Sequence, residues 1–199
     1  KKLWQTKNAL AEIEDCSKKT FDKKTIVIVM HCFTDGNGMY SENGVIFNSY
    51  FQWIRFTLSI AKKNKNFKYI FRSHPDSFKI YKSDRKILNY LFNGIKEKNI
   101  KLETIGNYSQ LISKNKVPLF ISAKGNFSQE IAIAGIKSIT LDNSAAPNEC
   151  CKKITNKKEY IKWLSGKGNY NELRLSNKLR LLAKINKEIY FETNKYIIY

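Results

Sequence analysis

One continuous apolar run limits what this chain can fold into more than any other feature. Residues 25–30 read Thr-Ile-Val-Ile-Val-Met, with two lysines before them and a polar, glycine-containing loop after them. Consecutive β-branched side chains without polar alternation are typical of a strand that is buried on both faces. Strands of that kind occur in parallel sheets that helices cover on both sides, so this run indicates an α/β domain.

Strand-like and helix-like segments alternate after this run. The expected strands are 25–30, 68–72, 101–105, 117–122 and 136–141, and the expected helices are 4–16, 48–63, 83–98, 108–114, 128–135 and one or two between 156 and 190. Such alternation predicts a Rossmann-like parallel sheet with helices on both faces. The chain of 199 residues is long enough for one such domain and too short for two. We expect a helical lead-in over 1–24, the Rossmann-like domain over 25–155, and a C-terminal helical segment over 156–199 that packs on it.

Ligands of such folds bind beyond the carboxyl ends of the strands. The first expected strand leads into His31 and Asp35, and the second leads into His74. These are the only two histidines of the chain, and both follow strands. His31 and Asp35 are candidates to hold an acceptor, a phosphate or a proton. The alternatives are an aspartate that forms a turn and a histidine that packs against Phe33.

The second of these strand ends reads Arg72-Ser73-His74-Pro75. Pro75 restricts the backbone and pushes His74 into an extended conformation. Arg72 offers a planar fork of donors that suits a phosphate, and His74 can donate to a phosphate oxygen or transfer a proton. The alternative is a strand end whose histidine bonds a neighbouring carbonyl.

A second candidate element begins at Gly125 and precedes the helix expected at 128–135. Gly125 allows a tight turn, and Asn126 or Ser128 can cap the helix, whose free N–H groups and dipole favour an anion. Glu130 stands in the first turn, from which a carboxylate can reach sugar hydroxyls. The alternative is an ordinary capped helix in which Glu130 complements the dipole.

Two common nucleotide-binding motifs are missing from the sequence. It contains neither GxGxxG nor GxxxxGK[ST], which argues against a dinucleotide-binding fingerprint and a P-loop. No His, Cys and Asp residues have metal-ligand spacing, so no metal is expected. The four cysteines include no CxxC pair, and we interpret them as free thiols of a cytoplasmic protein.

The net charge of +19 has two interpretations. The lysines are dispersed, which favours a lysine-rich, solvated surface over any one partner. The best functional use of the excess is peripheral contact with an anionic membrane, at the inner membrane face. A basic nucleic-acid-binding module is the less favoured alternative, because the lysines fall mainly on polar helix faces.

The ordered set of Arg72-Ser73-His74-Pro75, then Gly125 to Glu130, then Gly135 resembles the C-terminal domain of GT-B glycosyltransferases. More narrowly, it is similar to bacterial capsule and lipopolysaccharide polysaccharide-biosynthesis transferases. Those enzymes carry a Lys/Arg-x-His-Pro element and a later Ser-x-Glu helix start. The resemblance covers roughly residues 25–145, within the domain that it identifies as nucleotide-sugar-binding.

The resemblance implies a nucleotide-sugar donor of the CMP or UDP type, a glycan or lipid-linked acceptor, no cofactor and metal-independent catalysis. It places Arg72 and His74 at the phosphates, Ser128 and Gln129 at the helix start, and Glu130 at the ribose. The implied donor-binding residues are Arg72, Ser73, His74, Pro75, Gly125, Asn126, Ser128, Gln129 and Glu130, and the candidates for catalysis are His31, Asp35 and His74.

The chain departs from the GT-B pattern in its domain number. GT-B enzymes have two Rossmann-like domains, with the acceptor-side base usually on the first, and only one fits here. Either a second domain lies outside these residues or the chain is a divergent member. A sugar-nucleotide epimerase of the same architecture is the alternative enzyme.

Overall fold

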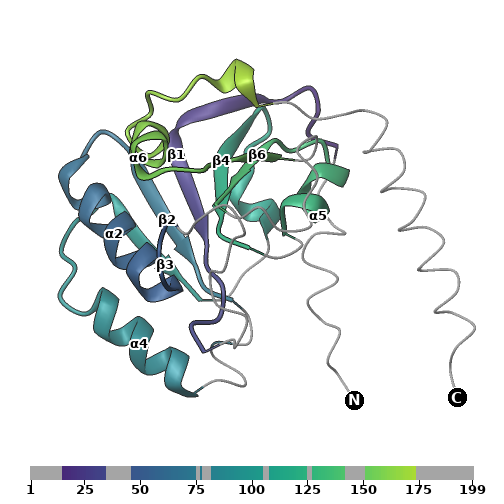
Figure 1. The fold of residues 1–199 in the computed structure, drawn as a ribbon. Coiled ribbons are helices and arrows are strands. Elements are labelled where there is room, and N and C mark those ends of the chain that lie inside the picture. The colour runs from purple at the N-terminus through teal and green to yellow at the C-terminus, as the bar shows by residue number, and fades with distance from the viewer. Residues whose placement is uncertain are drawn as a thin grey trace, which may run out of the picture.

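The fold is a single parallel sheet with helices on both faces, seen in a computed structural model (Figure 1). The structure describes residues 15–34, 46–74, 77, 82–104, 108–124, 127–141 and 151–173. Its strands are β1 (Thr20–Val29), β2 (Lys68–Arg72), β3 (Ile100–Glu103), β4 (Lys116–Ser122), β5 (Ser138–Thr140) and β6 (Cys151–Lys153). All neighbours are parallel, in the order β3-β2-β1-β4-β5-β6. This is the doubly wound Rossmann order, whose direction reverses between β1 and β4, so the predicted fold class is confirmed.

Helices cover the two faces of the sheet unequally. They are α2 (Tyr50–Lys63), α4 (Lys82–Phe92), α5 (Phe127–Ile133) and α6 (Lys157–Leu164), with 3-10 turns η2 (Tyr108–Leu111) and η3 (Tyr170–Glu172). The apolar side chains of α2, α4 and α6 share one core cluster with the sheet, whereas those of α5 and η2 belong to the other. Figure 1 shows α2 and α4 side by side on one flank, away from α5.

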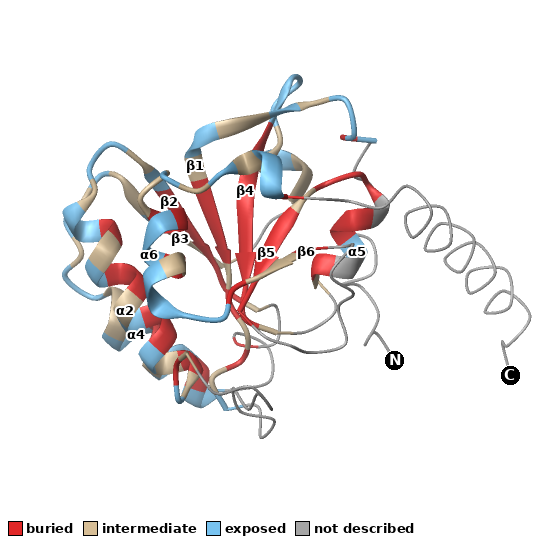
Figure 2. Ribbon diagram, turned by 45° about the horizontal axis from the view of Figure 1, so that its top comes forward, coloured by how far each residue is buried: buried red, intermediate tan, exposed pale blue. Residues whose placement is uncertain are grey.

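The strand β1 lies at the centre of both clusters. Ile26 and Ile28 contact the α2 side, and Val27 contacts the α5 side. All three side chains are fully buried. Figure 2 shows the central strands in the red of buried residues. Each contributes about 1.5–3 kcal/mol by leaving water, which explains why this run anchors the sheet.

Three elements show the main differences from the sequence prediction. The strand β1 starts at Thr20, because residues 20–22 already pair with β4, across an irregularity before Ile26. The helix expected over 83–98 ends at Phe92, and Gly94 with φ +73° follows it. The expected helix at 108–114 is the four-residue 3-10 turn η2.

The strand β6 is absent from the sequence prediction. Its three residues are one buried cysteine and two half-buried lysines, which carry no apolar strand pattern. The helix expected at 4–16 falls almost wholly outside the described residues. None of the described helices has the length and apolarity that a membrane crossing needs.

A buried polar cluster joins α6 to α2. The indole Nε1 of Trp53 donates to the hydroxyl of Tyr160 at 2.8 Å, and the Thr57 hydroxyl lies 2.6 Å from the same oxygen. All three side chains are fully buried. Burial raises the pKa of the Tyr160 hydroxyl above its ordinary value, so this group stays protonated.

The change Tyr160→Phe is expected to lower the free energy of unfolding by about 1–3 kcal/mol, because the buried Trp53 N–H loses its acceptor. Urea denaturation followed by circular dichroism measures the loss. Tyr90→Phe is the matched control, because it removes the same hydroxyl from a residue that is 73% exposed. Equal effects of the two changes would contradict a structural role for the buried cluster.

Candidate functional site

The two histidines meet at the carboxyl edge of the sheet. The backbone N–H of Met30 donates to the Arg72 carbonyl at 2.9 Å, so β1 and β2 stay aligned up to their ends. The next residues bring the rings of His31 and His74 together, with centroids 5.5 Å apart. The ring of His31 also stacks on Tyr50, the first residue of α2, at 4.9 Å. Both histidines are half-buried, so an imidazole pair faces the edge where ligands of this fold bind.

The loop that follows His31 is held in place by a buried carboxylate. Asp84, near the start of α4, is fully buried. Its carboxylate accepts hydrogen bonds from the backbone N–H groups of Phe33 (2.9 Å) and Thr34 (3.1 Å), and from the hydroxyls of Thr34 (2.7 Å) and Ser77 (2.9 Å). Asp84 therefore ties the loop after β1 to α4 and fixes the segment next to the histidine pair.

Arg72 lies inside the protein, on the η2 side of the sheet. It is 3% exposed, its Nη1 is 3.5 Å from Oε2 of Glu103, and its guanidinium lies 5.0 Å from the ring centre of Tyr108. Desolvation raises the pKa of Tyr108 to about 12, while the Arg72 charge lowers it and the Glu130 charge raises it. Arg72, Tyr108 and Glu130 thus form one electrostatic group. A phosphate contact of Arg72 stays a prediction.

The start of α5 shows where the second predicted element lies. The hydroxyl of Ser128 is fully buried and 3.1 Å from that of Ser122 at the end of β4, so it points into the protein. Glu130 is an exposed residue of α5, and the protein atoms around its carboxyl raise its pKa through desolvation. Gln129 belongs to the same seven-residue helix. Because β1 lies between β2 and β4, the two predicted elements flank its carboxyl end.

The other predicted residues make few described contacts or lie outside the described residues. Ser73 donates its backbone N–H to the Glu103 carbonyl at 3.0 Å, and its buried hydroxyl has no hydrogen-bond partner in the described part of the chain. The predicted residues that lie outside the described residues are Asp35, Pro75, Gly125 and Asn126. Within the described ranges, no three His, Cys, Asp or Glu side chains gather in a way that could hold a metal ion.

Sequence reasoning missed four residues that shape this edge. Tyr50 contacts His31 and Tyr108 contacts Arg72 through their rings, and the Glu103 carboxylate is paired with Arg72. Asp84 instead holds the loop that follows His31 through its carboxylate. Glu103 could have been found, since it ends the strand next to β2, in register with Arg72. The other three depend on how the helices pack, which no local pattern gives.

No protein-family model matches this sequence, and no curated protein matches it either.

Proposed function

We propose that this domain binds the nucleotide-sugar donor of a glycosyltransferase that acts in bacterial capsule or lipopolysaccharide synthesis. The observation that carries the proposal is the pairing of His31 and His74 at the carboxyl edge of a sheet with the Rossmann strand order. Nucleotide phosphates bind at this edge in such folds. Imidazole N–H groups are suitable donors to phosphate oxygens.

The pair suits the charge that develops in glycosyl transfer. The bond between the sugar's anomeric carbon and the phosphate oxygen breaks, and a bond to the acceptor oxygen forms. The nucleotide leaves with the bonding electrons, and the acceptor proton passes to a base. We assign His74 to the phosphate of the leaving nucleotide, where a fixed donor stabilises the developing charge. His31, next to it, is the described candidate for the base.

Arg72 and Glu130 support the same site in different ways. The contacts of Arg72 with Glu103 and Tyr108 hold the end of β2, two residues before His74. Arg72 is thus a positioning residue in this proposal. Glu130 is exposed on α5, beyond the end of β4, and is assigned to the ribose hydroxyls.

Calorimetric titration with UDP, CMP and uridine tests the phosphate assignment. The change His74→Ala is expected to weaken binding of UDP or CMP at least about tenfold, the worth of one hydrogen bond to a charged group. His74→Gln retains an N–H donor and is expected to recover part of the loss. Lys18→Gln, an exposed change near the start of β1, is the control and leaves binding unchanged.

The variant Glu130→Ala tests the ribose assignment in the same titration. Glu130→Ala is expected to weaken the binding of UDP and of uridine by the same factor. His74→Ala is expected to leave the binding of uridine unchanged. Unchanged nucleotide binding by both variants would contradict the proposal. Product analysis separates the epimerase alternative, which would alter the sugar without consuming an acceptor.

A further inference from the structure

A group of exposed cations lies on and beside α2 and α4, which form one flank of the fold side by side (Figure 1). We call it the α2–α4 flank and define it by its exposed cations. These are Arg55, Lys62, Lys63, Lys65, Lys68, Lys82, Arg85, Lys86, Lys96 and Lys98. Other exposed lysines, such as Lys18 and Lys114, lie elsewhere in the fold, so this flank carries one part of the positive charge.

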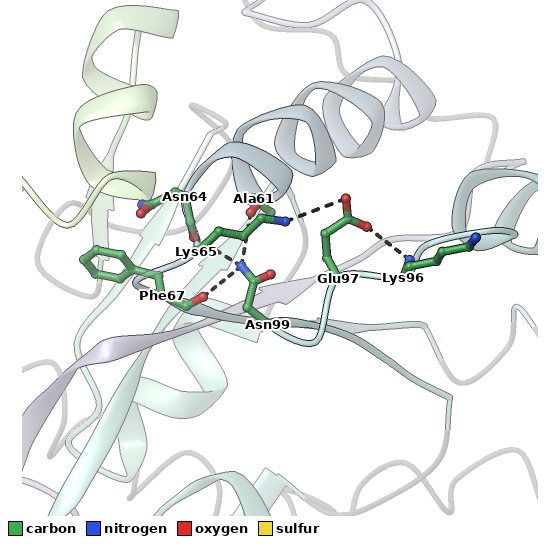
Figure 3. A network of polar contacts seen from close by, with 7 residues as sticks. All are labelled: Ala61, Asn64, Lys65, Phe67, Lys96, Glu97 and Asn99. Atoms are coloured by element: carbon green, nitrogen blue, oxygen red, sulfur yellow. Dashed lines mark hydrogen bonds and ion pairs between the residues drawn. The ribbon is translucent and has the colours of Figure 1, made fainter.

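Few described carboxylates lie on this flank. The described residues between 50 and 98 include two acids, Asp84 and Glu97. Asp84 is fully buried and engaged with the loop after β1. Glu97 lies 3.7 Å from Lys65 and accepts the backbone N–H of Lys96 (Figure 3). A hydrogen bond from its own backbone lowers the pKa of Glu97 most, and the charges of Lys65 and Lys62 lower it further.

An aromatic pair with one exposed ring lies within the same flank. The rings of Phe51 on α2 and Tyr90 on α4 are stacked, with centroids 6.2 Å apart and an interplanar angle of 28°. Tyr90 is 73% exposed, which makes it a large apolar ring held at the surface. Amphipathic aromatic rings favour the boundary between lipid headgroups and acyl chains.

A half-buried amide ties one end of the flank together. The Nδ2 of Asn99 lies 3.1 Å from each of three carbonyl oxygens, those of Ala61, Asn64 and Phe67 (Figure 3). These bonds join the end of α2 to the segments that enter β2 and β3. A surface hollow of about 460 Å³ lies beside this joint, lined by Lys65, Lys96, Glu97, Lys98 and Asn99. The hydrogen bonds of Asn99 thus hold the backbone segments that carry these lysines in place.

We propose that the α2–α4 flank docks on an anionic lipid surface. Cations spread over two neighbouring helices match a plane of negative headgroups, to which each Lys or Arg contributes about 1 kcal/mol. Single-stranded nucleic acid is bound instead in basic grooves where successive aromatic rings stack on bases. The flank offers one ring pair amid many cations, which favours the lipid surface. The proposal is independent of the nucleotide site.

Vesicle co-sedimentation of the full chain tests this proposal. Binding is expected to vesicles of phosphatidylcholine and phosphatidylglycerol in equal parts, and not to phosphatidylcholine alone. Added salt is expected to release the protein, because it screens exposed charges. Equal binding to both kinds of vesicle would overturn the electrostatic basis.

A matched pair of double variants locates the surface. Arg55→Gln with Lys86→Gln, one exposed residue from each helix, is expected to weaken vesicle binding roughly 30-fold. Lys18→Gln with Lys114→Gln removes the same charge from exposed positions beside the other core cluster and is expected to leave binding nearly unchanged. Equal losses in the two double variants would overturn the proposal. So would binding of a single-stranded oligonucleotide, lost only in the flank variant, without any vesicle binding.

Discussion

The change Asp84→Ala is expected to lower the free energy of unfolding by about 3–5 kcal/mol, because several hydrogen bonds to one buried carboxylate are lost together and each such bond contributes about 1.5–3 kcal/mol. The carboxylate is fully buried and accepts four hydrogen bonds, three of them from Phe33 and Thr34 and one from Ser77. Alanine leaves these donors without their acceptor, and the loop after β1 loses its attachment to α4.

Asp15→Ala is the matched control for this prediction. Asp15 is exposed, and its carboxylate accepts the backbone N–H of Ser17 at 2.9 Å, so its loss is expected to cost less than about 1 kcal/mol. Asp84→Asn is expected to fall between the two, because one oxygen acceptor is replaced by an amide that faces other donors. Urea denaturation gives all three values. A cost for Asp84→Ala no greater than that for Asp15→Ala would show that the buried network does not hold the fold.

The sheet was largely predictable because its strands are buried on both faces. The run at residues 25–30 and the strand Lys68–Arg72 need continuous apolar side chains to fill two core clusters, and that need is visible in the sequence. The strand β6 was missed, because this strand at the sheet edge consists of one buried cysteine and two half-buried lysines and has no apolar pattern. The pairing of β1 from Thr20 was missed for the same reason, since residues 20–24 are half-buried or exposed.

The candidate site was predictable only where a residue directly follows a strand. His31 and His74 follow neighbouring parallel strands, so the fold alone brings them to one edge. The partner that each side chain contacts was not predictable. Arg72 turns inward to Glu103 and Tyr108, and the Ser128 hydroxyl bonds Ser122, because these partners come from distant segments whose packing sets the contact.

The change Gly135→Ala is expected to cost about 3 kcal/mol of unfolding free energy, from backbone strain and a steric clash together. Gly135 follows α5 with φ +76°, and a Cβ there would lie 2.7 Å from the backbone nitrogen of Ser17. That neighbour cannot move freely, because the N–H of Cys16 donates to the Ala134 carbonyl at 2.7 Å. The substitution therefore forces apart the segment before β1 and the end of α5.

Gly94→Ala separates the two causes. Gly94 has φ +73°, nearly the same conformation, but a Cβ there would meet nothing within 4 Å. Its substitution is expected to cost about 1 kcal/mol, the strain of a left-handed alanine alone. The excess for Gly135→Ala in urea denaturation then measures the contact with Ser17. Equal costs at both glycines would mean that this contact relaxes freely and that the segment before β1 is not fixed to α5 as the structure has it.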